Sequence, residues 1–284
     1  MKLEMFEIVG RCLFWREKKV LVVGDLHLGY EEVLNEQGMV FPKSQLSDYL
    51  EEFGKIFGKT GELNEIVLLG DIKHHFGGIL RDESDGFYKL IEFFENNLDK
   101  NGKIVITEGN HDNILAPIVR RFDNVELKEG HLIENVLFFH GYRKFFEKNS
   151  KYFNKIDNKK DKIELNKVKK ELNGNKTELN GKNVELNENK VDLIVIGHFH
   201  PAVVLEDGVK KEKYKCFLHG KMKEIGKNAI IVPSFVNFSP GTDVLTWKNM
   251  KLEGKYNISN FNVVAVDENW GVYSLGKVKS LEKG

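Results

Sequence analysis

Five short apolar segments of this chain each end in a cluster of Asp, Asn or His residues. The segments lie at 20–23, 66–69, 104–107, 136–139 and 193–196. They are followed, in order, by Gly24-Asp25-Leu26-His27, Gly70-Asp71, Gly109-Asn110-His111-Asp112, His140-Gly141 and Gly197-His198-Phe199-His200. Short continuous apolar segments rich in Val, Ile and Phe are typical of strands buried on both faces. The sequence therefore predicts a buried sheet whose strands end in polar clusters.

Between the early segments, hydrophobic residues recur at helical spacing. One set is Leu46, Leu50, Phe53 and Phe57, and the other is Phe87, Leu90, Ile91, Phe94 and Leu98. The three- and four-residue spacing predicts two amphipathic helices, and Gly102 stands where the second helix is expected to stop. A shorter helix is expected at 113–122, with Pro117 inside it. Alternation of strand and helix predicts an α/β fold built on a mostly parallel sheet.

The segment from about 148 to 190 differs in composition from the rest of the chain. It is dominated by Lys, Asn and Glu, and Glu-Leu-Asn recurs every seven residues at 164, 171, 178 and 185. The period suits a coiled coil, but Gly174, Gly181 and the many Asn residues oppose a helix. A solvated low-complexity insertion is favoured over a paired helix. Because it lies between two strands with polar clusters, residues 1–284 are expected to form a single domain.

After His200 the chain returns to β-type segments at 229–232, 261–266 and 272–275, which predict a second, partly antiparallel sheet. The chain has 43 basic and 43 acidic residues, so a general basic field for nucleic acid is excluded but a local patch is not. Two cysteines are too few for a disulfide framework and indicate a reducing compartment. Without a signal peptide or a long apolar segment, we expect a cytoplasmic protein with no membrane contact.

The polar clusters together supply oxygen and nitrogen donors. Seven residues are of ligand type: Asp25, His27, Asp71, Asn110, His140, His198 and His200. This mixture suits manganese, iron, zinc, cobalt or nickel better than magnesium or calcium alone. Seven ligands suit two metals about 3.5–4 Å apart that share one carboxylate. One Gly-Asp or His after a strand usually marks a turn or a cap, so the prediction rests on all five clusters occurring together.

The spacing within two of the clusters supports a shared site. In extended chain, residues two apart point the same way, so Asp25 with His27, and His198 with His200, can face one site. Open α/β sheets bind ligands at the ends of their strands. Together these features predict a metal centre at one edge of the sheet.

The order of the clusters resembles the calcineurin-like metallophosphoesterase superfamily. The order is Asp-x-His, Gly-Asp, Gly-Asn-His-Asp, a single His-Gly and Gly-His-x-His, between Gly24 and His200. Gly24-Asp25-Leu26-His27-Leu28-Gly29, Phe41-Pro42 and Gly197-His198-Phe199-His200-Pro201 are also similar to a narrower group, the archaeal and DNA-ligase-associated phosphoesterases. The resemblance implies two stacked mixed β-sheets flanked by helices, an αββα sandwich.

The resemblance also implies a role for each residue of the clusters. Asp25, His27 and His200 would hold one divalent metal, Asn110, His140 and His198 a second, and Asp71 would bridge the two. Manganese is the first expectation, with iron, zinc, cobalt or nickel as alternatives. A hydroxide between the metals would be the nucleophile. His111 would stabilise developing charge and protonate the leaving oxygen, and Asp112 would orient His111.

Departures from the family pattern narrow the function. Protein Ser/Thr phosphatases carry Asp-Arg-Gly shortly after the second cluster and prefer Glu at the position of Asp112, so that class is not expected. Lys73, His74 and Arg143 are candidates for contacting substrate phosphate, with a solvated loop as an equal alternative. His131 and His219 belong to no cluster and are expected to be structural or at the surface.

The expected function is a dinuclear metal-dependent phosphoric ester hydrolase. A phosphodiesterase or nuclease acting on nucleotides or nucleic acid is favoured over a small-molecule phosphomonoesterase. A non-catalytic scaffold that retains the fold is the alternative from another class, and the complete ligand set with His111 argues against it. Metallo-β-lactamase-like and amidohydrolase-like enzymes also use His-x-His, but not as the last motif after Gly-Asn-His-Asp.

Overall fold

The first three apolar segments become adjacent parallel strands of one sheet. The computed structural model describes residues 2–40, 42–75, 81–112, 114–142, 191–206, 208, 210–247, 251–252 and 256–281. In spatial order the first sheet contains β1 (Glu7–Val9), β2 (Cys12–Trp15), β3 (Val20–Val23), β4 (Leu63–Leu68), β5 (Leu98–Thr107) and β6 (Val125–Lys128). Strands β3 to β6 run parallel, and β1 and β2 extend the sheet as antiparallel strands.

The last two apolar segments belong to a second sheet. Its main path is β13 (Thr242–Asp243), β10 (Pro201–Glu206), β11 (Lys211–Met222), β12 (Lys227–Ile231), β9 (Leu193–Ile196), β8 (Val136–Phe139) and β7 (His131–Ile133). β16 (Asn262–Val266) pairs with β11, and β17 (Val272–Lys277) pairs with β16. β8, β9 and β12 are parallel, whereas β10, β11 and β12 are antiparallel. Both sheets are therefore mixed, as predicted.

The alternation of side chains along each strand builds the layers. Val20 and Val22 of β3 point into the core between the two sheets, where they join Phe138 of the second sheet. Leu21 and Val23 point the other way, into the core beneath the helices. Burying one such side chain stabilises the fold by about 1.5–3 kcal/mol, so the alternation fixes which face each strand presents.

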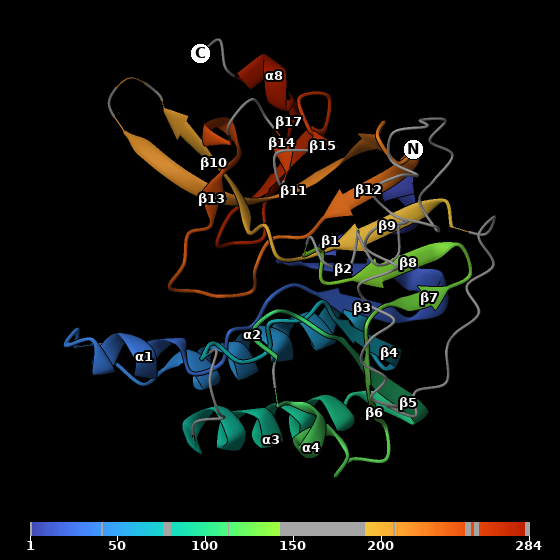
Figure 1. The fold of residues 1–284 in the computed structure, drawn as a ribbon, viewed down its shortest axis with the longest axis vertical. Helices are drawn as coiled ribbons and strands as arrows, with labels where there is room; N and C mark the ends of the chain where they lie inside the picture. Colours follow the sequence, from blue (N-terminus) through green and yellow to red (C-terminus); the bar gives the residue numbers. More distant parts are fainter. Residues whose placement is uncertain are drawn as a thin grey trace, which may run out of the picture.

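Helices and short segments cover the outer faces of the stacked sheets (Figure 1). On the first sheet lie α2 (Gln45–Thr60), α3 (Arg81–Glu95) and α4 (Ala116–Val119), whereas α1 (Tyr30–Glu36) has no buried residue and lies to the left of α2 in Figure 1. The outer face of the second sheet packs against residues of η3 (Val244–Thr246) and α8 (Val278–Leu281). The smaller elements are η1 (Lys2–Met5), η2 (Arg16–Lys18), β14 (Lys251–Leu252) and β15 (Tyr256–Asn257). The predicted αββα arrangement is confirmed.

One predicted boundary is wrong. The second predicted helix is α3, but it ends at Glu95, and Leu98 is the first residue of β5. Gly102, the expected helix stop, lies inside that strand. Leu98 fits the helical spacing of Phe94 by coincidence, because it pairs across the sheet with Leu63 of β4 instead. The expected helix at 113–122 is the short α4, with Pro117 in its first turn, where a missing N–H costs nothing.

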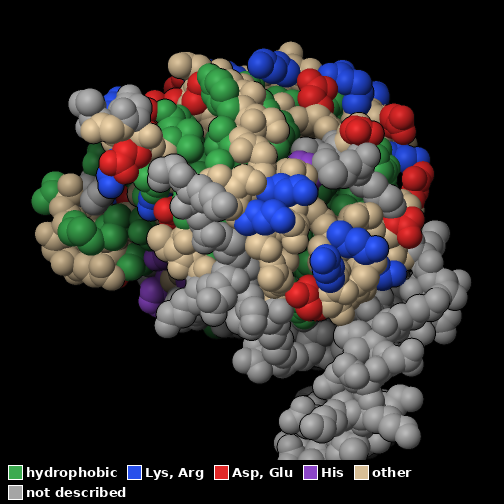
Figure 2. Space-filling model, turned by 90° about the horizontal axis from the view of Figure 1, so that it is seen from above, with side chains coloured by type: hydrophobic (Ala, Val, Ile, Leu, Met, Phe, Trp, Pro, Cys, Tyr) green, Lys and Arg blue, Asp and Glu red, His purple; other side chains and the backbone are tan. Residues whose placement is uncertain are grey.

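Two sequence predictions fall outside the described residues: the insertion at 148–190 and the candidate residue Arg143. Over the face drawn in Figure 2, Lys and Arg side chains lie among Asp and Glu side chains, in keeping with the equal numbers of both in the chain. None of the helices in the described ranges is both long and apolar enough to cross a membrane.

Candidate metal centre

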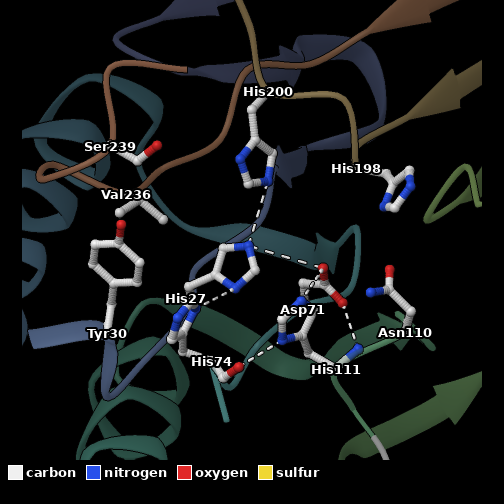
Figure 3. Close-up of a pocket in the computed structure, with 10 residues that line it drawn as sticks. All are labelled: His27, Tyr30, Asp71, His74, Asn110, His111, His198, His200, Val236 and Ser239. Atoms are coloured by element: carbon white, nitrogen blue, oxygen red, sulfur yellow. Dashed lines mark hydrogen bonds and ion pairs between the residues drawn. The ribbon is translucent and has the colours of Figure 1, made fainter. Parts of the chain in front are cut away.

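The polar clusters that follow five strands meet at one place between the sheets. Ligand atoms of Asp25, His27 and His200 all lie within 4.8 Å of one another, and so do those of Asp71, His140 and His198. Asn110 Oδ1 lies 3.1 Å from His140 Nε2 and so belongs beside the second group. All seven residues predicted as ligands are thus brought together, from loops of both sheets. Figure 3 shows five of them: His27, Asp71, Asn110, His198 and His200.

Asp71 occupies the position between the two groups. Its Oδ2 lies 3.8 Å from His27 Nε2 on one side and 3.3 Å from His140 Nε2 on the other. Its Oδ1 accepts a hydrogen bond of 2.9 Å from the backbone N–H of His111. One carboxylate oxygen is therefore held by the backbone, while the other faces the histidines of both groups.

The backbone at the site is strained. His27, Asp71, His198 and His200 have φ values of 45°, 47°, 69° and 45°. These are four of the eight non-glycine residues with positive φ in the described ranges. Such residues cost about 1–3 kcal/mol each and persist where the surroundings fix them, often at functional sites. After β3, β4 and β9 the chain bends into this left-handed conformation, so the extended geometry expected for Asp25-x-His27 and His198-x-His200 is not what brings these side chains together.

The loop that follows β5 approaches Asp71 closely. A Cβ atom at Gly109 would lie 2.3 Å from both the backbone nitrogen and Oδ1 of Asp71. Such a distance is far inside van der Waals contact, so a glycine is required at the start of this cluster. The close approach allows the loop to bring Asn110 and His111 to the site.

Asp112 makes contacts with the backbone that the sequence analysis did not expect. Its carboxylate accepts hydrogen bonds from the backbone N–H groups of Ile72, at 2.8 Å, and Gly109, at 2.9 Å. The ring of His111 is instead oriented by a backbone carbonyl, because its Nδ1 lies 2.5 Å from the oxygen of His74. Asp112 therefore joins the loops after β4 and β5, and His74 fixes the imidazole of His111.

Burial and mutual charge set the protonation of the site. Burial alone would raise the pKa of Asp25, but the rings of His200, His140 and His27 outweigh it and hold that pKa well below its usual value. Burial lowers the pKa of His27 to about 3 and that of His198 to about 4. Carboxylates that stay ionised and imidazoles that stay neutral are the forms that bind metals.

His140 behaves differently from the other candidate ligands. Burial lowers its pKa, but the carboxylates of Asp71 and Asp25 and the carbonyl of Leu69 outweigh this and raise it to about 9. His140 Nδ1 lies 2.6 Å from that carbonyl oxygen, which orients the ring and leaves Nε2 facing Asp71. A cation that binds beside Nε2 must therefore displace a proton at neutral pH.

A cavity of about 280 Å³ opens onto the site (Figure 3). It is lined by His27, Tyr30, Asp71, His74, Asn110, His111, His198, His200, Val236 and Ser239. Of the candidates for substrate contact, His74 lines this cavity. Lys73 does not: its side chain is buried and its Nζ bonds the carbonyl of His75. Contact between Lys73 and substrate phosphate therefore stays a prediction, made from outside the wall of this cavity.

Three lining residues were not predicted from the sequence. Tyr30 follows the first cluster directly, and its ring lies edge-on to that of His74 at 4.4 Å. Its position next to the motif was a usable signal. Val236 and Ser239 come from the loop after β12, where nothing in the sequence marks them. His131 and His219 are buried away from the cavity, in line with a structural role.

The comparison with protein families agrees with this geometry. The family model described as calcineurin-like phosphoesterase matches residues 18–202, which include all five clusters. The crystal structure of the nuclease MPE of Pseudomonas putida matches with a TM-score of 0.53 and 14% identity, covering 95% of this chain and 100% of that chain. The protein of unknown function AQ665 from Aquifex aeolicus matches with a TM-score of 0.33 and 18% identity, covering 64% and 78%. The search of curated proteins found no match.

Proposed function

Because this chain belongs to the calcineurin-like phosphoesterase family, we propose that it is a dinuclear metal enzyme that hydrolyses phosphodiesters in nucleotides or nucleic acid. The observation that carries the proposal is the meeting of two groups of three ligand-type residues, with Asp71 Oδ2 facing histidines of both groups. The first cluster and the Phe41-Pro42 pair favour a place near the archaeal and DNA-ligase-associated phosphoesterases within the family.

The residues fit a pair of divalent metals. Asp25 and His140 are fully buried and Asp71 nearly so, and buried carboxylates in such a cluster call for compensating positive charge. One metal would be held by Asp25, His27 and His200, the other by Asn110, His140 and His198, with Asp71 shared. This mixed oxygen and nitrogen set suits manganese first, and also iron, zinc, cobalt or nickel. When bound, the metals supply Lewis acidity and lower the pKa of a bound water to about 7.

The ring of His111 is placed to donate a hydrogen bond or a proton to charged oxygens of the substrate. Its Nδ1 donates to the carbonyl of His74, which turns Nε2 toward Asp71 Oδ2, at 3.8 Å, and toward the cavity. In its protonated form the ring can donate from Nε2 to a phosphoryl oxygen or to the leaving oxygen. His74 shares the cavity wall and stacks on His111 with ring centroids 5.6 Å apart.

The cavity wall favours a diester over a monoester. None of the ten described residues that line the cavity is Lys or Arg. A phosphomonoester carries a charge of about −1.5 to −2 at pH 7, whereas a diester carries a single negative charge. A wall that adds no Lys or Arg charge to that of the metals therefore suits the single charge of the diester better.

A substrate panel tests the proposal. Protein loaded with Mn²⁺ is assayed on bis-p-nitrophenyl phosphate, p-nitrophenyl phosphate, cyclic nucleotides, and single- and double-stranded DNA. We expect the kcat/KM for diesters to exceed that for the monoester. A monoester preference would contradict the diester assignment, and a metal-loaded protein that hydrolyses nothing in the panel would indicate a scaffold.

We also propose that the protein works in the cytoplasm. Both cysteines of the chain, Cys12 and Cys216, are buried and unpaired, which suits a reducing compartment. Fractionation of the source cells tests this proposal. Recovery of the protein outside the cytoplasm would contradict it.

A further inference from the structure

The loop that carries His27, residues 26–29, is held by a buried glutamine outside the cavity. Gln45 is the first residue of α2 and is only 2% exposed. Its Oε1 accepts a hydrogen bond of 3.0 Å from the N–H of Gly29, and its Nε2 donates one of 2.9 Å to the carbonyl of His27. The amide thus fixes backbone groups at His27 and two residues beyond it.

A second side chain of α2 completes this contact. The hydroxyl of Tyr49, one helical turn after Gln45, donates a hydrogen bond of 2.7 Å to the carbonyl of Leu26. The same hydroxyl accepts a hydrogen bond of 3.0 Å from Gln45 Nε2. Residues four apart lie on the same face of a helix, so Gln45 and Tyr49 meet the His27 loop together.

The opposite side of the loop is bound by the segment that carries Asp71. The N–H groups of Leu26 and His27 donate to the carbonyl of Asp71, at 3.2 and 2.9 Å, and that of Leu28 donates to the carbonyl of Ile72 at 2.7 Å. The loop is therefore held by hydrogen bonds to α2 on one side and to the Asp71 segment on the other. His27, with φ of 45°, is hydrogen-bonded through its backbone to both sides.

The end of the loop admits no larger residue. Gly29 has φ of 81°, and a Cβ atom there would lie 2.5 Å from Cγ of Glu83 in α3. Glu83 itself accepts hydrogen bonds from the N–H groups of His74 and His75, at 3.2 and 2.8 Å. Helix α3 thus binds the segment of His74 and His75, whereas α2 binds the His27 loop. The two helices therefore hold different segments.

We propose that Gln45 is a positioning residue, which keeps His27 in its left-handed conformation so that its imidazole stays beside Asp25 and His200. Gln45 touches neither the cavity nor a ligand atom of the site. The inference rests on the proposed metal site. Loss of the Gln45 amide weakens one metal site, that of Asp25, His27 and His200, and spares the site of His140 and His198, whose loops Gln45 does not bond.

Metal titration of four variants tests the inference. Metal-free wild type, Gln45→Leu, Gln45→Glu, Tyr49→Phe and Ile56→Ala are titrated with Mn²⁺ by isothermal calorimetry, and each melting temperature is recorded. In Gln45→Leu we expect one of two Mn²⁺ sites to weaken by about 10–100-fold, the range for residues that support metal ligands. The other site should keep its affinity, and kcat should fall more than KM rises.

The remaining variants separate positioning from stability. Gln45→Glu keeps an acceptor for the Gly29 N–H and loses the donor to His27, so its loss of Mn²⁺ affinity should be intermediate. This variant can still be measured if Gln45→Leu does not fold. Tyr49→Phe removes the donor to the Leu26 carbonyl and one acceptor of Gln45 Nε2 but leaves both bonds from Gln45 to the loop, so its Mn²⁺ affinity should fall less. Ile56→Ala removes a fully buried side chain of the same helix and should lower the melting temperature without changing either Mn²⁺ affinity.

Two outcomes would overturn the positioning role of Gln45 and leave the proposed function standing. One is a wild type with two Mn²⁺ sites and a Gln45→Leu variant that binds both as tightly. The other is a loss in Gln45→Leu that is equal at both sites and no greater than in Ile56→Ala. A wild type that binds no Mn²⁺ would overturn the proposed function and the positioning role together.

Discussion

Strand β4 meets histidine from the second sheet at both of its ends, with different results. Near its start, Glu65 Oε1 lies 2.5 Å from His131 Nε2, and both side chains are largely buried. Just past its end, Asp71 Oδ2 has three histidine nitrogens within 3.8 Å, from His27, His111 and His140. One imidazole is enough to neutralise a carboxylate, so the two additional imidazoles beside Asp71 need another explanation.

The backbone differs in the same way. Glu65 and His131 lie in regular strands, whereas Asp71 and His27 are in the left-handed region. Strain of about 1–3 kcal/mol per residue is not needed to form an ion pair. Both ends of β4 join carboxylate and imidazole across the two sheets. The comparison teaches that a candidate metal centre differs from a structural ion pair in its additional imidazole donors and in its strained backbone.

The largest expected effect comes from removing the charge of Asp71. Asp71→Asn takes away the shared negative ligand and leaves two cations to repel each other. Metal content should fall from about two per chain, and kcat should drop by orders of magnitude. Metal analysis and steady-state kinetics measure both. Full metal occupancy with a near-normal rate would remove Asp71 from the bridging position.

Replacing His111 should separate chemistry from metal binding. His111→Ala is expected to keep both metals and to lower kcat by about 10²–10⁴, the usual contribution of a positioned acid–base group. The loss should be smaller for a nitrophenyl ester, whose leaving group needs no proton, than for a nucleotide ester. A variant that loses metal would make His111 a ligand and merge the two roles that we separate.

Much of this site follows from the sequence because its signal is local. Each cluster comes directly after an apolar strand, so the seven ligand-type residues and His111 were identifiable before the fold was known. Asp112 was recognised, but its bonds to the N–H groups of Ile72 and Gly109, one of them forty residues away in the chain, were not. Non-local bonds to backbone leave no trace in residue spacing.

The same limit explains the errors in the fold. Leu98 continues the periodicity of α3, and only its pairing with Leu63 shows that it starts a strand. β10 was not predicted although Ala202–Leu205 is apolar, and the long β11 was not predicted because four of the six residues at 210–215 are Lys. Their strand conformation comes from pairing with each other and with β12 and β16, which is tertiary context rather than local preference.

Metal affinity should depend on pH through His140. Its pKa of about 9 in the metal-free protein means that it carries a proton at pH 7, and a metal must displace that proton. Apparent affinity for Mn²⁺ should therefore rise as pH increases toward 9, by at most about tenfold per pH unit for one proton released. His27 and His198, with pKa values of about 3 and 4, are already neutral and add nothing in this range.

Calorimetry in buffers of different ionisation enthalpy measures the proton count. We expect at least about one proton released per chain at pH 7, from His140, with ionisation of the metal-bound water adding to it. Metal binding without proton release would show that His140 is neutral in the free protein or is not a ligand.

The smallest effect is expected at the other end of β4. Glu65→Gln makes the same chemical change as Asp71→Asn, but at the ion pair with His131. Stability should fall by at most about 1 kcal/mol, the usual range for an ion pair, because the two atoms lack hydrogen-bond geometry. Metal content and kcat should not change. A loss of metal in this variant would break the distinction between the two ends of the strand.

The central claim is that two metals share Asp71, and anomalous diffraction tests it most directly. Crystals grown with Mn²⁺ should show two anomalous peaks about 3.5–4 Å apart, one on each side of the Asp71 carboxylate. The first peak is expected beside Asp25, His27 and His200, and the second beside Asn110, His140 and His198. A single peak, or peaks that do not contact Asp71, would contradict the account.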